Sequence, residues 1–404
     1  MKVSPNQIKE GMIFASDVFD INYRLLIPQG ETVQPHHIRI LKIWGVQEVD
    51  ILGAEESLPD KTSGISQDTI EEARETVGQI FRFVDINHPA IKEICRLSIR
   101  YRSKEGHFRH LIKRQGDPVE ARRFNSQIPM KIRANNLKLP ETPLIISELR
   151  EMIDNPYASA SDIARVVNKS TSLSALLLRI VNSAFYNFPE KIDSISWAVT
   201  LIGTKEIVNL AFGISVMEVF TDIPKEIIDV QSFIRHSLFC GILSRILGAN
   251  KNLVHTEQLF VAGLLHDIGR LVIYKYYPKE SMALLALADQ QGRPLYRIEK
   301  EMGGIRHTHV GYYLMKKWHL PHELVDNIFH HHCPSQGINP LKPGIIHMAD
   351  IITTGLGIGN SGERFVPSFD KVAWDTLCVS PGLFDTAVKQ ALHQLKFLGI
   401  FNQG

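Results

Sequence analysis

The first 52 residues alternate apolar and polar positions in a way that predicts a small α+β unit. Residues 12–27 alternate on either side of a polar turn, which is typical of a β-hairpin. Residues 35–44 then show helical spacing, and Gly45 stands where glycine commonly ends a helix. Residues 46–52 can return as a strand, so we expect a hairpin, a helix and a strand in this order.

The pattern changes after residue 52. Residues 53–66 are rich in Gly, Pro, Ser and charge and have no apolar period, so they predict a linker. Apolar spacing over residues 67–115 indicates connecting helices. The stretch 96–133 holds eleven Lys or Arg and three Asp or Glu. We interpret it as a solvated, partly irregular face, with an anion-binding site as the alternative, and we assign residues 67–136 to connecting helices and a basic loop.

Helix signals follow one another closely in the rest of the chain. Apolar residues recur at helical spacing over residues 144–153, and Asn155, which precedes a proline, ends that helix. Ser159 or Ser161 can cap the next helix, and Thr171 can cap a third. Further helices with Pro or Gly between them are expected to follow.

No strand pattern competes with this helical spacing, so the fold class is expected to be mainly α. We predict a helical module over residues 137–400, with a first helical lobe at 137–228 and a second half at 229–400. With 404 residues, of which 44% are hydrophobic, the chain is long enough for two or three globular domains.

Composition narrows the classes of function. The 45 Lys and Arg residues nearly balance the 43 Asp and Glu residues, so no overall field attracts nucleic acid, and nucleic-acid binding is not expected. No apolar stretch reaches the ~20 residues of a membrane span, and the first residues lack the apolar run of a signal peptide. The four cysteines are scattered, without a CxxC pair. We therefore expect a protein of the reducing cytoplasm that does not cross a membrane.

The candidate chemistry lies in the second half of the module. Eight of the seventeen histidines fall within residues 307–347. Upstream, His266 and Asp267 form an adjacent pair within residues 263–270, which we predict to lie in a buried helix because it is apolar on nearly every side. Burying an imidazole and a carboxylate without partners costs several kcal/mol, and a divalent cation would compensate both groups at once. A salt bridge to Arg270 or to a neighbouring histidine is the alternative.

Other ligand-type side chains lie on separate predicted segments. The candidate metal ligands are His236, His266, Asp267, His309, His331, His332 and Asp350. Nitrogen and oxygen donors without thiolates suit Fe, Mn, Zn, Ni or Mg, and the set could serve two ions bridged by the aspartate of the His-Asp pair. A core histidine satisfied by hydrogen bonds is the alternative for any of these histidines taken singly.

The order of these ligands is similar to that in the HD-type metal-dependent phosphohydrolases, especially the HD-GYP cyclic-dinucleotide phosphodiesterases. The preceding lobe resembles more closely the HDOD family, a sister group regarded as regulatory. Residues at that family's characteristic places are Pro140, Pro156, Leu176, Asn182, Ser183 and Gly203. The HDOD resemblance covers roughly residues 137–338. Residues 1–52 resemble the small unit that often precedes HD-GYP domains, in Gly11-Met12, the run 25–30 and residues 44–46.

This resemblance implies a bacterial signal-transduction regulator built on a helical HDOD bundle. It also implies a divalent metal, with iron or manganese expected before the other ions named above. The chain departs from the HD-GYP enzymes at several positions. Those enzymes follow the paired histidines with a glutamate and a Gly-Tyr-Pro loop, whereas Cys333 and Pro334 follow them here. Arg270 replaces the lysine usual after His-Asp-x-Gly, and a planar guanidinium does not reproduce an ammonium. Ser232 stands where some of these enzymes have an additional glutamate ligand, so a third metal is not expected.

Two functions are compatible with these residues. The first is a binding and relay module that a signalling protein or a nucleotide second messenger engages, with a homodimer as one compatible form and a metal that stabilises the fold or reports a signal. The second is a metal-dependent phosphodiesterase acting on a cyclic dinucleotide or another nucleotide, in which Asp267 acts with a metal-activated water and Arg270 contacts phosphate. Because the substrate-side loop is missing, we expect the relay function with little or no hydrolysis.

Overall fold

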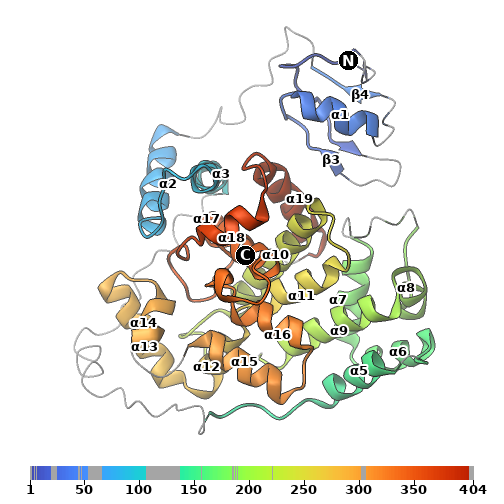
Figure 1. Cartoon of the computed structure of the whole chain (residues 1–404), viewed down its shortest axis with the longest axis vertical. Coiled ribbons are helices and arrows are strands. Elements are labelled where there is room, and N and C mark those ends of the chain that lie inside the picture. Colours follow the sequence, from blue (N-terminus) through green and yellow to red (C-terminus); the bar gives the residue numbers. More distant parts are fainter. Residues whose placement is uncertain are drawn as a thin grey trace.

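The chain is mainly helical, as predicted (Figure 1). The computed structural model describes residues 2–3, 5, 7–19, 25–43, 46, 48–52, 66–105, 137–155, 157–183, 186, 188, 190–220, 222–301 and 306–399. The predicted linker therefore lies outside the described residues except for Ser66, and so does most of the predicted basic loop. Among the helices described, none combines the length and the apolar character that crossing a membrane requires.

Two short strand pairs and one helix make up the N-terminal unit. Its elements are β1 (Lys2–Val3), β2 (Val18–Phe19), β3 (Leu25–Ile27), α1 (Pro35–Ile43) and β4 (Val49–Asp50). Strands β2 and β3 pair antiparallel as the predicted hairpin, whereas the antiparallel pairing of β1 with β4 was not predicted. The unit has its own small cluster of buried side chains, which includes Phe14 and Leu41.

The predicted connecting helices are α2 (Gln67–Ile80) and α3 (Pro89–Glu105). Ser66 caps α2, because its side chain accepts a hydrogen bond from the Thr69 amide. The two helices pack on each other, and α3 packs on α17 (Leu341–Leu356). Arg102 of α3 reinforces this contact, since its Nε donates to the Gly355 carbonyl at the end of α17, 2.9 Å away.

Five helices build the first lobe of the module. They are α5 (Leu144–Asp154), α6 (Ala160–Val167), α7 (Thr171–Val181), α8 (Ile195–Ile202) and α9 (Thr204–Glu218). As predicted, α5 ends at Asn155, and Ser159 caps α6, where it forms a capping box with Asp162. The predicted cap of α7 was one residue late: Ser170 accepts from the Leu173 amide, and Thr171 is the first helical residue.

The second half continues the bundle (Figure 1). Its helices are α10 (Val230–Asn250), α11 (Thr256–Leu265), α12 (Ile268–Tyr276), α13 (Pro278–Gln291), α14 (Leu295–Glu301), α15 (His307–Lys317), α16 (His322–Phe329), the short η3 (Pro334–Gln336), α17, α18 (Lys371–Leu377) and α19 (Leu383–Phe397). The long helix α10 packs on α11, α17 and α19. One continuous hydrophobic core joins helices from α2 to α19, so the connecting helices share the core of both lobes.

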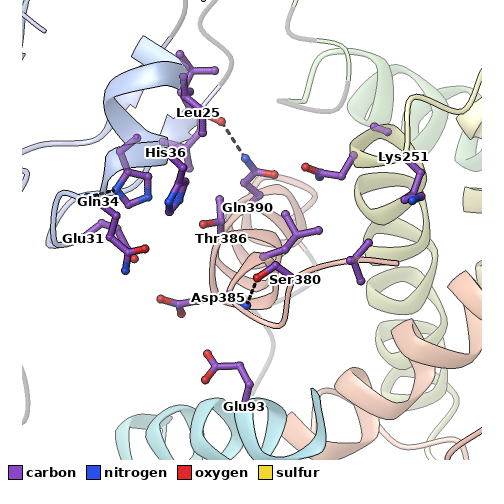
Figure 2. Close-up of a pocket in the computed structure, with 18 of the residues that line it drawn as sticks. Leu25, Glu31, Gln34, His36, Glu93, Lys251, Ser380, Asp385, Thr386 and Gln390 are labelled. Carbon is purple, nitrogen blue, oxygen red and sulfur yellow. Dashed lines mark hydrogen bonds between the residues drawn. The ribbon is translucent and has the colours of Figure 1, made fainter. Parts of the chain in front are cut away.

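The N-terminal unit meets the bundle across a cavity of about 1050 Å³ (Figure 2). Two polar contacts with α19 bridge it. Lys389 pairs with Glu31 at 2.5 Å, and the Gln390 side-chain amide donates to the Leu25 carbonyl at 2.9 Å. The unit therefore combines a separate core with a polar contact to the module.

Candidate metal centre

The His-Asp pair lies at a break between two helices, which corrects the prediction that it lies within one helix. His266 follows the last residue of α11, and Asp267 precedes α12 with φ −99° and ψ 15°. These dihedral angles interrupt the helix, since regular helical ψ is near −42°. The break brings both side chains into one buried space, where His266 Nε2 lies 3.5 Å from Asp267 Oδ2.

Two further predicted ligands reach the same space from distant helices. His236 comes from α10 and Asp350 from α17. His236 Nε2 lies 3.3 Å from Asp350 Oδ1, and His266 Nε2 lies 3.7 Å from the same oxygen. We call His236, His266 and Asp350 the Oδ2-side group, because His266 faces that oxygen of Asp267.

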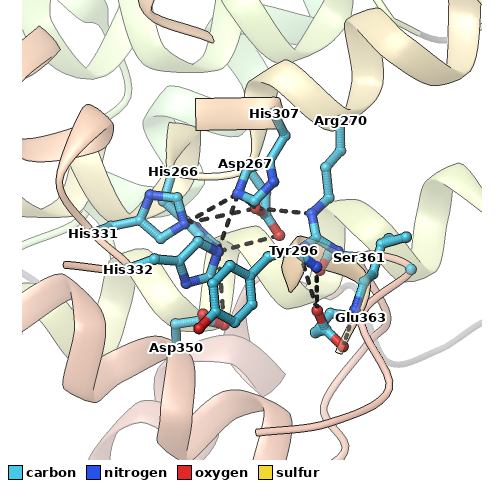
Figure 3. Close-up of polar contacts among 12 residues, drawn as sticks. His266, Asp267, Arg270, Tyr296, His307, His331, His332, Asp350, Ser361 and Glu363 are labelled. Carbon is cyan, nitrogen blue, oxygen red and sulfur yellow. Dashed lines mark hydrogen bonds and ion pairs between the residues drawn. The ribbon is translucent and has the colours of Figure 1, made fainter. Parts of the chain in front are cut away.

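The other carboxylate oxygen of Asp267 faces a second set of side chains (Figure 3). His307 Nε2 lies 3.2 Å from Asp267 Oδ1, and His331 Nε2 lies 3.8 Å from it. His332 Nε2 is 3.1 Å from His307 Nε2. We call His307, His331 and His332 the Oδ1-side group. Six of the seven predicted ligands thus come together, and His307 joins them.

His309 is the predicted ligand that the structure does not bring to the centre, and His307 occupies that place. Both residues lie on α15, but side chains two positions apart on a helix point about 200° away from each other. The His309 ring packs against Phe329 instead, with ring centroids 5.0 Å apart. Gly311 lies on the same helical face as His307, and Gly269 of α12 packs against that face, so the packing of α15 on α12 selects His307.

Hydrogen bonds to the far ring nitrogens fix the orientation of three imidazoles. The Nδ1 atoms of His266 and His331 lie 2.7 and 2.6 Å from the carbonyls of Gly263 and Ile328. His307 Nδ1 lies 2.6 Å from a carboxylate oxygen of buried Glu299. In each case Nδ1–H donates, so Nε2 of the neutral ring has its lone pair directed into the centre.

The unsatisfied atoms of the centre fit a divalent cation. Nε2 of His236 and Nε2 of His266 are buried and make no hydrogen bond. His266 Nε2 faces carboxylate oxygens of Asp267 and Asp350, an arrangement that is favourable only when a proton or a metal cation lies between nitrogen and oxygen. Three overlapping sets of these side chains, all including Asp267 or Asp350, keep their donor atoms within 4.8 Å of one another. Imidazole and carboxylate donors suit Fe, Mn or Zn.

The protonation states of Asp267, His331 and His332 agree with this donor role, whereas Cys240, Asp267 and Asp350 outweigh burial and hold the pKa of His266 well above its usual value, so that a metal would displace a proton there. Burial raises the pKa of Asp267, but Arg270 and the nearby histidines outweigh it and hold that pKa well below its usual range. Burial, with His266 and His307 as neighbours, lowers the pKa of His331 to about 3. Burial and the adjacent His331 likewise lower the pKa of His332. Anionic carboxylates and neutral imidazoles are the forms that bind metal.

A buried ion pair supports the centre from one side. The Arg270 side chain is 1% exposed, and its Nε lies 3.2 Å from Asp267 Oδ1. Its other end lies 3.6 Å from Glu363 Oε2. Glu363 accepts hydrogen bonds from the amides of Leu295 and Tyr296, at 3.1 and 3.2 Å. Sequence patterns did not identify Glu363 or Glu299, because both come from segments without a motif.

An aromatic ring covers the Oδ1-side group. Tyr296 stacks on His332 with ring centroids 4.8 Å apart and planes 22° apart (Figure 3). The Tyr296 hydroxyl lies 3.0 Å from the Ser368 hydroxyl, within hydrogen-bonding distance. Tyr296 was also missed in the sequence, since a lone tyrosine carries no signal of its neighbours.

A helical bundle that gathers imidazoles around an adjacent His-Asp pair has the arrangement of an HD-type domain. Residues 139–334 match the model of the HDOD domain family. These residues therefore form an HDOD domain, as the resemblance of the first lobe implied.

Known proteins share part of this sequence or its fold. An uncharacterized protein of Treponema pallidum (strain Nichols) is 27% identical over 199 residues, which are 48% of this chain and 38% of that protein. The match thus spans well under half of that relative. An HDOD-domain protein of unknown function from Geobacter sulfurreducens superposes with a TM-score of 0.54 at 21% identity, covering 70% of this chain and 98% of its own. A predicted metal-dependent phosphohydrolase from Shewanella amazonensis SB2B gives 0.52 at 19% identity, covering 69% and 98%. These likenesses show the fold.

Proposed function

We propose that this chain is a signal-transduction regulator whose HDOD module binds one or more divalent metal ions, iron or manganese, and engages a partner with little or no hydrolysis. The partner would be a signalling protein or a nucleotide second messenger. A signalling role is supported by a structurally similar protein of Marinobacter aquaeolei VT8 that is named for signal transduction, with a TM-score of 0.52 at 22% identity over 67% of this chain and 62% of that one.

The burial of the centre is the observation that carries this proposal. The side chains of His266, His331 and Asp267 are 0%, 0% and 3% exposed. Tyr296 stacks on His332, so the donor atoms lie beneath other side chains and not at the surface. A nucleophile must be held within about 3 to 3.5 Å of its target and in line with it, and this alignment can account for ~7 to 11 kcal/mol of the barrier. A buried centre does not provide that alignment.

The segment after the paired histidines supports the same conclusion. It turns at once into η3, and the Ser335 amide donates to Asp370 at the start of α18, 3.0 Å away. The segment is thereby fastened to the bundle. It offers no counterpart of the substrate-side loop that follows these histidines in the HD-GYP enzymes.

A hydrolysis assay tests the proposal. Protein purified without oxygen and loaded with iron or manganese is incubated with cyclic di-GMP, and the linear product is measured by chromatography. We expect no product above that of the Asp267→Ala variant. Turnover above about 0.1 per second, close to the ~1 to 10³ per second of ordinary enzymes, would contradict the proposal if Asp267→Ala abolishes it.

The second candidate function is a metal-dependent phosphohydrolase. It is favoured by one observation, the two groups of donors that share Asp267. A bound metal would supply Lewis acidity and activate water. The chain's own part would be to hold the two groups and, after displacement of Tyr296, to admit a substrate. His255→Ala is a matched control for both functions, because His255 is exposed and pairs with Glu206 on the surface.

A further inference from the structure

Three arginines lie around a pair of phenylalanine rings outside the metal centre. The rings of Phe83 and Phe365 meet edge to face, with centroids 5.2 Å apart. The guanidinium carbon of Arg82 lies 4.7 Å from the centre of each ring. The guanidinium carbon of Arg297 lies 5.5 Å from the centre of Phe83, and that of Arg364 lies 5.5 Å from the centre of Phe365. We call Arg82, Arg297 and Arg364 the arginine cluster.

The cluster is assembled from segments that are far apart in the sequence. Arg82 follows the end of α2, Arg297 lies on α14, and Arg364 lies in the segment after α17. The Val366 amide donates to the carbonyl of Ile80, the last residue of α2, at 3.0 Å and so joins two of these segments. The three positive charges therefore come together only in the folded chain.

The charge of the arginine cluster is only partly balanced. Among the residues that the structure describes, no carboxylate forms an ion pair with Arg82 or Arg297. Arg364 Nη1 lies 3.9 Å from Asp289 Oδ1, which is longer than a hydrogen bond. Three guanidinium groups thus share one loosely placed carboxylate.

Two further carboxylates in this part of the module have other partners. Glu363 faces Arg270 at 3.6 Å, on the side of the buried metal centre. Glu301 pairs with Arg293, and the charge of Arg297 acts on it in addition. Both acids therefore form their ion pairs with arginines outside the cluster.

The arginine cluster keeps hydrogen-bond donors for an anion. Contact with an aromatic ring uses no acceptor, so the N–H groups of exposed Arg82 stay available. Arg297 is partly exposed and donates one hydrogen bond, from Nη2 to the neutral Ser368 hydroxyl at 2.9 Å. Arg364 is 25% exposed, and its Nε makes no hydrogen bond. An anion with several acceptor oxygens can engage these donors together.

We propose that the arginine cluster binds the phosphate groups of a small molecule, which is a nucleotide or an inorganic polyphosphate. Phosphate oxygens match the planar fork of a guanidinium, and their charge offsets the positive charge of the cluster. The aromatic rings hold the guanidinium groups in place, so less side-chain freedom is lost on binding. This inference deepens the binding role of the proposed function by naming a ligand class and its site, and it does not depend on the metal.

Calorimetric titration of the metal-free full chain tests the proposal, because without metal a phosphate cannot bind at the metal centre. The probes are cyclic di-GMP, GTP and inorganic pyrophosphate. We expect at least one probe to bind with a Kd in the micromolar range, and binding should weaken with added salt because exposed charges are screened. Tighter binding of a nucleotide than of pyrophosphate would identify a nucleotide site, and the reverse order would identify an inorganic polyphosphate site.

Arginine variants locate the bound phosphate. Arg82→Gln and Arg297→Gln should each weaken binding at least tenfold, because each removes a charge and part of the guanidinium fork. Arg165→Gln is the matched control: it changes the net charge equally, and Arg165 pairs with Asp162 on exposed α6 of the first lobe. This control should bind as the parent does.

Several results would overturn the proposal. No probe binding with a Kd tighter than about 1 mM would refute the phosphate site and leave the metal site of the proposed function intact. Binding that persists in both Arg82→Gln and Arg297→Gln would place the ligand elsewhere, while still supporting the binding role of the proposed function. An equal loss in Arg165→Gln would show an effect of overall charge only. If one cluster variant fails to fold, the other variant and the salt dependence still decide.

Discussion

Replacing Asp267 with alanine in the metal-free protein tests the charge balance of the buried centre. The change removes the carboxylate that lies 3.2 Å from Arg270 and leaves a guanidinium that is 1% exposed. Removing one partner of a buried ion pair typically costs about 3 to 5 kcal/mol, because the remaining charge is desolvated without compensation. Glu363 lies 3.6 Å from the other end of Arg270 and limits the loss, so we expect the lower part of this range.

Thermal unfolding in the presence of a chelator measures the effect. For a cooperative unit of roughly 250 residues, a change of 1 kcal/mol shifts the melting temperature by about 2 °C, so a loss of about 3 to 4 kcal/mol should make Asp267→Ala melt about 6 to 8 °C below the parent. Adding Mn²⁺ at a hundred times its dissociation constant should stabilise the parent by about 2.7 kcal/mol and leave the variant unchanged.

Two control variants separate charge from packing. Asp267→Ala combined with Arg270→Met removes both charges of this pair. It should recover part of the lost stability, because no buried unpaired guanidinium remains and Glu363 keeps its hydrogen bonds from the Leu295 and Tyr296 amides. Glu301→Ala breaks a more exposed pair with Arg293 and should leave the melting temperature close to that of the parent. If Asp267→Ala melts within 1 to 2 °C of the parent in chelator, or if the double variant is less stable than the single one, the charge argument is wrong.

Three further predictions concern the scaffold. Gly269→Ala should destabilise the module by about 1 to 3 kcal/mol in urea unfolding, because a Cβ would lie 1.9 Å from the His307 carbonyl oxygen. Gly78→Ala is the control: its Cβ would meet open space, so it should stabilise the module by about 0.5 to 1 kcal/mol. Equal effects of the two substitutions would contradict this prediction. Arg102→Met should cost about 1 to 3 kcal/mol in the same assay by leaving carbonyls at the end of α17 unsatisfied, and an unchanged midpoint would exclude that role. Burial lowers the pKa of His37 to about 4 in the folded protein, whereas the unfolded chain keeps a histidine pKa of about 6.5. The free energy of unfolding of the N-terminal unit should therefore be independent of His37 above pH ~6.5. It should decrease by up to about 1.4 kcal/mol per pH unit as the pH falls from there towards 4. Amide exchange of that unit measures the effect, and a flat profile would refute it.

Local rules made the helical part of the fold predictable from the sequence. Ser159 could be identified as a cap because its role depends only on the next three residues, and Asn155 ends α5 next to a proline. The pairing of β1 with β4 could not be identified, because strands of two residues carry almost no alternation and their partners lie far apart in the chain.

The candidate site was predictable as a set of residue types and only partly as positions. The adjacent pair His266 and Asp267 stood out because two polar groups interrupt an apolar stretch. The choice between His307 and His309 depends on which face of α15 packs against α12, and only tertiary packing decides it. Glu363 reaches the centre from a loop after α17, where no periodicity points to it.

The stacked Tyr296 has a consequence for the rate at which an ion can exchange. The ring lies against His332 and its hydroxyl against Ser368, so an ion would enter or leave through local opening of this cover. An ion captured while the chain folds would be retained for as long as this cover stays closed. The intrinsic affinities of divalent ions differ widely across the first transition row. Such retention would nevertheless preserve the ion that was abundant during synthesis, so that growth conditions, more than relative affinity, would decide which metal the purified protein contains.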